Sequence, residues 1–221
     1  MSPGLLHLLH LVSPALPVGA YAYSQGLEWA IDDHWLQGDD ALGSWITEVM
    51  RRGVGQLDAP VMLRCLNAWQ NGDAQSLHHW NEWLLACRET KELLLEDQQL
   101  GLALQRLLIS LNVTGAIEGF CEPPSYASQF ALACHHWSIA PADAVQGFIY
   151  SWLENQIAAA TKIVPLGQTH AQKLLLQILE NIPPIAEHAL TIEDDDLGIS
   201  LPGLAMASAQ HERQYSRLFR S

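Results

Sequence analysis

Apolar residues along this chain recur every three or four positions, which is the spacing of a helix face. The clearest series is Leu93, Leu100, Leu104, Leu108 and Leu111. No series of alternating apolar and polar positions bounded by turns is present, so strands are not expected. The sequence therefore predicts an all-α fold, a single-domain multi-helix bundle with ordered Pro/Gly loops and a flexible C-terminal tail.

Proline, glycine and capping residues divide this pattern into separate helices. We expect helices over 5–12, 24–37, 45–53, 58–70, 74–111 (as one helix or two), 125–137, 143–162 and 168–180. Ser24 is expected to cap the second of these helices, and Arg88 is expected to pair with Glu92 one turn later. We assign residues 1–192 to the helical domain and residues 193–221 to an acidic linker and a C-terminal docking tail.

The charge composition excludes two classes of function. The formal net charge is −13, and the chain has only three lysines, Lys91, Lys162 and Lys173. A broad basic surface for a phosphate backbone is therefore not expected, which argues against nucleic-acid binding. No lysine directly precedes serine or threonine, so the chain lacks the P-loop of nucleotide hydrolases.

The N-terminal segment resembles a secretion signal only superficially. Residues 1–27 carry no charge, but the basic start of a signal peptide is missing, and Pro14 and Pro17 interrupt the apolar stretch. No run of 18 or more residues is apolar enough to span a bilayer. We therefore expect no membrane association and a cytoplasmic location.

The residues that bind metals or act as nucleophiles form no recognisable local motif. The four cysteines, which lie far apart without a CxxC pair, are expected to be reduced, buried thiols: Cys65, Cys87, Cys121 and Cys134. His7 and His10 could share one helix face, but no third ligand stands at a regular local spacing. GxSxG is absent. The sequence predicts no catalytic residue and no stable metal site, although a site assembled from distant residues remains open.

Three segments differ from ordinary helix sequence. Residues 13–28, SPALPVGAYAYSQGLE, contain a Pro-Val-Gly turn and two tyrosines, and predict an ordered loop between helices. Residues 162–168, KIVPLGQ, place a lysine one turn before a proline on an acidic protein. Residues 211–221, HERQYSRLFRS, combine three arginines with tyrosine, leucine and phenylalanine, the residue types of interface anchors.

These segments, together with RETKELLLEDQQLG at 88–101, resemble the UreF family of urease accessory proteins from end to end. SPALPVGAYAYSQGLE is similar to the family's most specific signature, and KIVPLGQTHAQKLLL and HERQYSRLFRS resemble later ones. The departures are small. Ala22 stands where serine is frequent in the family, and Gln210 stands where a basic residue is common.

The resemblance implies an all-helical homodimer that is not an enzyme and that acts in assembly of the urease nickel centre. Its implied partners are a UreD-type protein (UreH in some organisms), the GTPase UreG and apo-urease. The protein would bridge the first two and modulate the GTPase. No cofactor is expected to bind stably, and nickel would only pass through the complex.

The same resemblance points to particular residues. Glu28, Lys162 and Gln168 are expected to face the GTPase. The loop motif consists of Pro17, Gly19, Tyr21, Tyr23 and Ser24. The partner-docking tail consists of His211, Glu212, Arg213, Tyr215, Ser216, Arg217, Leu218 and Phe219.

Two alternatives remain open at this stage. A histidine-based nickel carrier would bind nickel tightly in equilibrium dialysis and lose it on replacement of His7 and His10. The tail, which carries three arginines against one glutamate, could be held on its own acidic body instead of remaining flexible.

Overall fold

The structure is a computed structural model that describes residues 3–113, 115, 123–198 and 200–221. Its elements in chain order are α1 Pro3–Leu11, η1 Ala20–Ala22, α2 Leu27–Asp32, α3 Asp39–Glu48, η2 Val49–Asp58, α4 Ala59–Asn71, α5 Ala74–Ala86, α6 Lys91–Ser110, α7 Tyr126–His136, α8 Pro141–Ile163, α9 Gln168–Leu179, α10 Ile182–Thr191, η3 Asp194–Asp196 and α11 Pro202–His211. All of these elements are helical, which confirms the predicted all-α, single-domain bundle.

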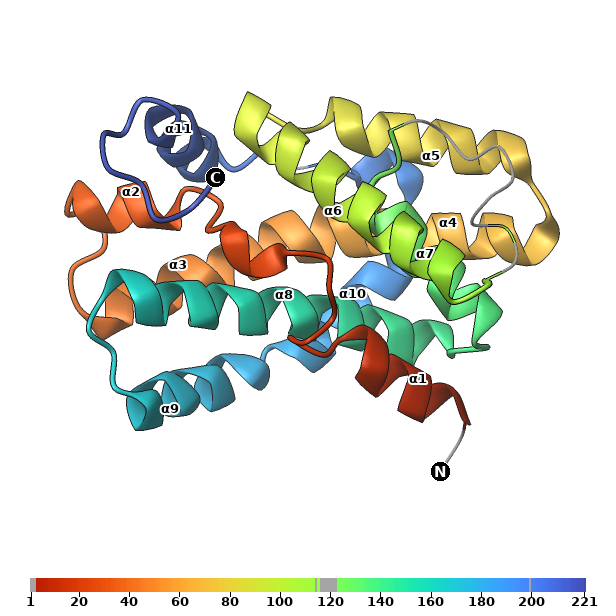
Figure 1. Ribbon diagram of the computed structural model, residues 1–221, viewed down its shortest axis with the longest axis horizontal. Helices are drawn as coiled ribbons and strands as arrows, with labels where there is room; N and C mark the ends of the chain where they lie inside the picture. Colours follow the sequence, from red (N-terminus) through yellow and green to blue (C-terminus); the bar gives the residue numbers. More distant parts are fainter. Residues whose placement is uncertain (1–2, 114, 116–122, 199) are drawn as a thin grey trace.

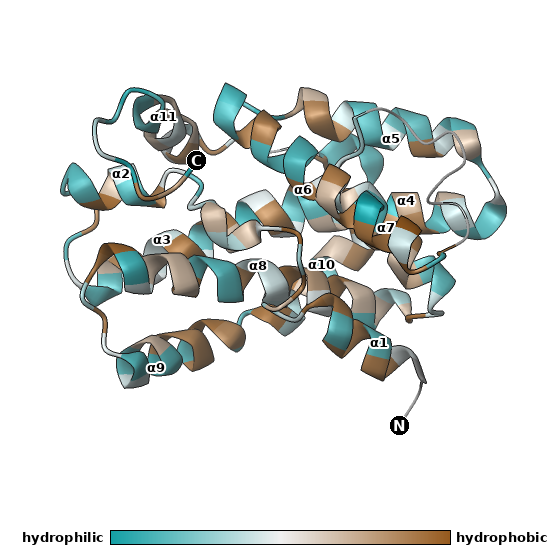
Figure 2. Cartoon of the chain, viewed as in Figure 1, coloured by the Kyte–Doolittle hydropathy of each residue, from teal (hydrophilic) through white to brown (hydrophobic). Residues whose placement is uncertain are grey.

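Helix α8 is the central element of the bundle (Figure 1). It packs against α1, α2, α4, α9 and α10, and residues on several of its sides, such as Val145, Gly147 and Phe148, are buried. Helices α4, α5, α6 and α7 form a second group, in which α7 contacts both α4 and α6. Most helices carry apolar residues on one side and hydrophilic residues on the other, as Figure 2 shows.

Close packing of α6 requires a glycine at position 101. A Cβ atom at Gly101 would lie 2.1 Å from the carbonyl oxygen of Pro124, in the segment that leads into α7. Only a residue without a side chain allows the two backbones to approach this closely. The contact fixes α7 beside α6.

Most of the expected helices are present close to the expected boundaries. The helix expected over 45–53 instead begins at Asp39 and continues through η2 to Asp58. The helix expected to be capped by Ser24 begins at Leu27, with Gly26 at the capping position. The stretch 74–111 is two helices, and Pro60 lies in the first turn of α4. The second expected helix ends at Asp32, earlier than predicted, because His34 adopts a left-handed conformation with φ of 62°. The cysteine prediction is confirmed for Cys65 and Cys134, which are buried. Cys87 is half-buried, and Cys121 lies outside the described residues.

Two helices were not predicted, α10 (Ile182–Thr191), which begins at the proline pair 183–184, and α11. Residues 193–221 were expected to form a linker and tail, but Pro202–His211 form α11, with Pro202 in the first turn where its missing N–H group does no harm. The preceding linker is also held on the body. Arg64 donates from Nε to Asp194 at 2.6 Å and from Nη2 to the carbonyl of Ile192 at 2.9 Å. The functional division at residue 193 stays a prediction.

None of the helices in the described part of the chain combines the length and the apolar character that crossing a membrane requires.

Candidate functional site

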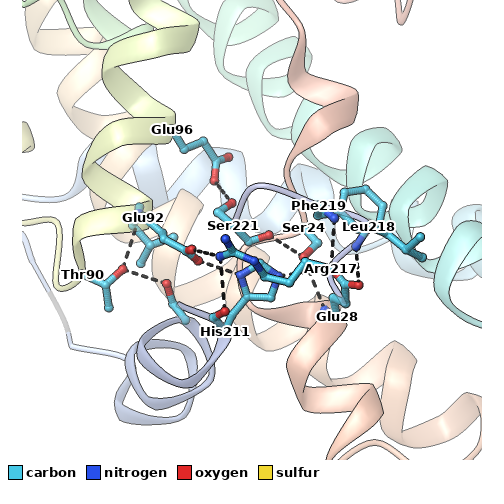
Figure 3. A network of polar contacts seen from close by, with 12 residues as sticks. Ser24, Glu28, Thr90, Glu92, Glu96, His211, Arg217, Leu218, Phe219 and Ser221 are labelled. Carbon is cyan, nitrogen blue, oxygen red and sulfur yellow. Dashed lines mark hydrogen bonds and ion pairs between the residues drawn. The ribbon is translucent and has the colours of Figure 1, made fainter. Parts of the chain in front are cut away.

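The C-terminal tail, residues 211–221, lies on the body of the protein (Figure 3). Helix α11 packs against α2 and α6, and the tail that follows contacts the loop before α2 and the first turns of α6. This differs from the flexible tail that the sequence predicted. The alternative, in which the acidic body holds the tail, describes this conformation. We call Ser24, Glu28, Glu92 and Glu96, which are buried or partly buried residues of the body that hydrogen-bond to the tail, the tail-binding site.

Glu28, in the first turn of α2, binds the tail through both carboxylate oxygens. Oε1 accepts a hydrogen bond from the backbone N–H of Leu218 at 2.7 Å, and Oε2 accepts one from the N–H of Phe219 at 3.0 Å. Oε2 also lies 3.1 Å from Nε2 of His211. Glu28 is only 4% exposed, so almost all of its hydrogen-bonding capacity is directed at the tail.

The ring of His211 lies between two carboxylates and is completely buried. Its Nδ1 atom is 2.7 Å from Oε2 of Glu92, opposite the contact with Glu28. The other oxygen of Glu92 accepts a hydrogen bond from Nη1 of Arg217 at 2.6 Å. The network therefore joins α2, α6 and the tail through a continuous series of polar contacts.

The end of the tail pairs with the loop before α2. The backbone N–H of Arg220 donates to the carbonyl of Ala22 at 2.8 Å, and the N–H of Ser24 donates to the main-chain oxygen of Ser221 at 2.8 Å. The hydroxyl of Ser24 donates to the same oxygen at 2.6 Å. Two segments almost 200 positions apart are thus joined by backbone hydrogen bonds.

Glu96 binds the side chain of the last of these tail residues. Its Oε2 atom accepts a hydrogen bond from the hydroxyl of Ser221 at 2.6 Å, and its Oε1 atom accepts one from Nε2 of Gln25 at 2.8 Å. Burial raises the pKa of Glu96 to about 7, although these two hydrogen bonds favour the charged form and oppose the shift. Glu96 is therefore a carboxyl group that titrates near neutral pH.

The backbone of the loop before α2 adopts a left-handed conformation that is unfavourable for a non-glycine residue. Gln25 and Gly26 both have positive φ, 54° and 73°. A Cβ atom at Gly26 would lie 2.7 Å from the backbone nitrogen of Ser208, so only glycine lets α11 pack here. The side chain of Gln25 is fixed from both ends, because it also accepts a hydrogen bond from Nε1 of Trp152 at 2.8 Å. These contacts compensate for the unfavourable backbone of Gln25.

Lys162, at the end of α8, joins the loop to the tail on the exposed side. Its ammonium group lies 5.5 Å from the centre of the Tyr21 ring and 5.4 Å from that of Phe219. It also donates to the carbonyl of Tyr21 at 3.3 Å. Lys162 itself is exposed, and Gln168, which begins α9, is exposed as well. Both residues are accessible to a partner.

The tail presents several of its side chains to solvent. Tyr215 is 96% exposed and Leu218 is 68% exposed, whereas Phe219 is buried. Glu212, Arg213, Ser216 and Arg217 are also exposed. Ser216 has φ of 67°, which marks a sharp turn in the tail. The tail thus holds to the body through its backbone, Phe219 and Ser221, and directs other side chains outward.

The loop motif, like the tail, contains both buried and exposed residues. Ser24 and Tyr23 are buried, whereas Pro17 and Tyr21 are exposed. Gly19 has φ of 82°, a conformation that glycine adopts without strain, and it directs the chain into η1. The motif therefore combines a surface-exposed part with a part that binds the tail.

One predicted site residue lies in a different environment from the one expected. Glu28 was expected on a partner-facing surface, but the structure buries its carboxylate under the tail. The physical reason is that two backbone N–H groups and a histidine need an acceptor at this point. A partner could contact Glu28 only after the tail had moved.

Sequence reasoning missed Glu92 and Glu96 as individual site residues. They lie four positions apart on one face of α6, within the segment 88–101 that carried the family resemblance. That acidic pair was the available signal. The role of this pair could not be recognised from the sequence, because the residues that it binds, His211, Arg217 and Ser221, lie at the other end of the chain.

A second buried charged cluster supports the start of α6. Arg88 donates to Oδ2 of Asp97 from Nε at 2.9 Å and from Nη2 at 2.7 Å, and it also binds Asp58. Oδ1 of Asp97 accepts the N–H of Tyr126 at 2.7 Å. The predicted pair between Arg88 and Glu92 is wrong, because Arg88 turns inward to two aspartates while Glu92 binds the tail.

The described residues contain no group of three or more histidine, cysteine, aspartate or glutamate side chains arranged to hold a metal ion. His7 stacks on Trp137 with ring centres 5.3 Å apart, and His10 meets the same ring edge-on at 6.2 Å. The pair on which the nickel-carrier alternative depended therefore packs around a tryptophan.

A cavity of about 340 Å³ lies beside the tail-binding site. Its walls come from the loop before α2, η2, α6, α8 and the segment around Leu201, and they are mostly apolar. Gln25 and Glu96 line it, and they also connect to the tail. The network that holds the tail therefore also forms part of the cavity wall.

Comparison with known proteins places this geometry in a family context. The sequence profile of the UreF family matches residues 36–179. The chain is 58% identical to the urease accessory protein UreF of Teredinibacter turnerae over 221 residues, which is the full length of both chains. It is 50% identical to UreF of Hahella chejuensis over 217 residues, covering 98% of each chain. It is 49% identical to UreF of Chromohalobacter salexigens, covering 98% of this chain and 94% of that protein.

Proposed function

Because the chain belongs to the UreF family of urease accessory proteins, we propose that it is a non-catalytic adaptor that bridges a UreD/UreH-type protein and the GTPase UreG on apo-urease. It modulates the GTPase, and nickel passes through the assembled complex without binding stably to this chain. The protein acts as a homodimer in the cytoplasm. Family membership supports a role in urease maturation. The individual partners and the surfaces that bind them are part of our proposal.

The anchored tail is the observation that best supports an adaptor. Leu218 and Phe219 are neighbours, yet the first is exposed and the second is buried. Because Glu28 fixes both backbone N–H groups, the outward side chains have defined positions before any partner binds. Preordering reduces the entropy lost on association. Exposed tyrosine and leucine beside arginine form the kind of surface that anchors a protein partner.

We expect the exposed tail side chains to bind the UreD/UreH-type partner. Replacing Tyr215 and Leu218 together with alanine should weaken co-purification of that partner by at least about tenfold, since anchor residues each contribute about 1–2 kcal/mol or more. Deleting residues 211–221 should abolish it. Pull-down of the tagged UreD/UreH-type protein and urease activation in a reconstituted system measure the effect.

Leu176→Ala is the matched control, because Leu176 is a similarly exposed leucine, at 62%, on α9. It should leave the interaction unchanged. Full-strength co-purification with the tail deleted, or equal losses for Leu176→Ala and Leu218→Ala, would contradict a docking tail.

Lys162 and Gln168 form the proposed GTPase-facing side. Lys162→Ala should lower UreG binding and urease activation while changing the thermal midpoint little, because exposed cation–π and polar contacts contribute only about 0.5–1 kcal/mol. Lys173→Ala, at an exposed lysine on α9, is the control. Biolayer interferometry should show weaker UreG binding for Lys162→Ala than for Lys173→Ala. Equal UreG binding by the two variants would show that Lys162 is not part of the GTPase-facing surface.

A further inference from the structure

A groove of about 500 Å³ lies between the first turns of α6 and the docked tail. Lys91, Leu95 and Gln99, which are four positions apart on one face of α6, line it and are all exposed. Residues of the tail and Tyr23, from the loop before α2, complete the lining. The groove therefore depends on the docked conformation of the tail, and its volume is within the range of ligand-binding sites.

Positive charge gathers in this groove. Three of the eleven lysine and arginine residues of the chain line it: Lys91, Arg217 and Arg220. The negatively charged residues of its lining are Glu92 and Glu212. Glu92 is already engaged, because one of its oxygens accepts a hydrogen bond from Arg217 at 2.6 Å and the other lies 2.7 Å from the His211 ring. The groove thus carries an excess of cations on a protein whose net charge is −13.

Two of these cations are available to a ligand. Within the described ranges of the chain, the ammonium group of Lys91 and the guanidinium group of Arg220 form no hydrogen bond or ion pair. Both side chains are exposed. The backbone of Arg220 is nevertheless fixed, since its N–H group donates to the carbonyl of Ala22 at 2.8 Å. The tail therefore presents this cation at a defined place before any ligand binds.

The groove combines charge with an apolar contact. Leu95 is 43% exposed and lies one turn after Lys91. Cations beside an exposed leucine complement an acidic segment that also carries an apolar side chain. The acidic body repels such a segment, and a local group of cations on that body steers it into place.

We propose that this groove binds an acidic segment of the protein partner that the tail anchors, with Lys91 and Arg220 pairing with its carboxylates and Leu95 contacting its apolar side chain. The inference rests on the proposed docking role of the tail, and it adds the chemistry of the partner at that site. Charged pairs at the exposed rim of an interface act mainly on the association rate and on its salt dependence.

Association kinetics of the full-length protein with the purified UreD/UreH-type partner test the groove. Biolayer interferometry measures the rates at about 0.05 M and about 0.5 M salt, because salt screens contacts between exposed charges. Lys91→Glu combined with Arg220→Glu should lower the association rate at least about tenfold at the lower salt concentration. The difference from the unmodified protein should shrink at the higher concentration, whereas damage to the fold would persist there.

A matched double variant controls for the net charge of the protein. Arg106→Glu combined with Lys173→Glu reverses two exposed cations outside the groove, on α6 and α9, and changes the net charge by the same amount. It should slow association much less than the reversal within the groove. Equal association rates for the two double variants would overturn the proposal.

Glu212→Gln provides a test in the opposite direction. It removes an exposed negative charge from the lining of the groove, so it should accelerate association by about two- to threefold at the lower salt concentration. Misfolding cannot produce such a gain. An unchanged or lower association rate would contradict an acidic ligand.

The remaining outcomes separate the groove from the other proposals. If tail deletion abolishes co-purification but the double reversal in the groove has no effect, the docking role stands and the groove is wrong. If the truncated protein binds its partner at full strength, the docking role is wrong and the groove proposal fails with it. If the double reversal weakens self-association in sedimentation velocity and leaves partner binding unchanged, the ligand is a second copy of this chain, which also overturns the proposal.

Discussion

Replacing Glu28 with alanine should release the C-terminal tail and lower the free energy of unfolding by about 3 kcal/mol. Alanine would leave two backbone N–H groups, those of Leu218 and Phe219, without an acceptor, and it would remove one of the two carboxylates around His211. Differential scanning fluorimetry and chemical denaturation measure the loss of stability. Exchange of the tail amides measures its release.

Two further variants make this result specific. Glu28→Gln keeps one acceptor oxygen and should lie between the unmodified protein and Glu28→Ala. Glu212→Ala removes an exposed glutamate of the tail itself and should change stability by less than about 0.5 kcal/mol. The sequence alone favoured a partner-facing Glu28, which predicts lost urease activation with a nearly unchanged midpoint. If Glu28→Ala leaves the thermal midpoint of unfolding unchanged, the interpretation of Glu28 as a partner-facing residue would be supported instead.

The helices could be predicted from local sequence because each depends on signals within about a turn of itself. Ser125 precedes α7 and its side chain accepts a hydrogen bond from the N–H of Ser128, as a capping serine does. Pro60 and Pro141 lie in the first turns of α4 and α8, where proline is well tolerated.

The tail-binding site could not be derived in this way, because its members are far apart in the chain. Glu28 and His211 are separated by 183 positions, and no local rule connects a carboxylate near one end with a histidine near the other. The sequence analysis distinguished three unusual segments and treated them as separate motifs. The sequence did not show that two of them, residues 13–28 and 211–221, bind each other. It also did not show that residues 88–101 bind the same tail through Glu92 and Glu96.

Helix α11 was missed for a related reason. Its segment contains Pro202 and Gly203, which locally favour a linker, and its stability comes from packing against α2 and α6. Gly26 lets α11 approach within contact of α2. Tertiary contacts thus override the local preference, and the same contacts place His211 between Glu28 and Glu92.

Arg88→Ala should be among the most destabilising single changes in this protein, lowering the free energy of unfolding by about 3–5 kcal/mol. Arg88 is the cation shared by Asp58 and Asp97, whose side chains are only 16% and 5% exposed. Its removal leaves two buried carboxylates facing each other without compensation. Because this cluster holds the start of α6, where Glu92 and Glu96 bind the tail, the tail amides should also lose protection.

The pH dependence of this variant identifies the mechanism. Burial raises the pKa of Asp58, and the charge of Arg88 opposes that shift, so its removal should raise the pKa of Asp58 further. A carboxyl group with a raised folded pKa binds more protons when folded, and the folded variant therefore gains stability as pH falls. Denaturation midpoints should show a smaller loss at about pH 5 than at about pH 8.

Two comparisons separate the buried charges from general damage to α6. Arg106→Ala, at an exposed arginine of the same helix, should change stability by less than about 0.5 kcal/mol. Combining Arg88→Met with Asp58→Asn and Asp97→Asn removes all three charges while keeping an oxygen to accept the N–H of Tyr126. This triple variant should recover most of the lost stability, because replacing a whole buried ion cluster is far less costly than removing one member. If it is no more stable than Arg88→Ala, the loss reflects packing of the arginine side chain and not uncompensated charge.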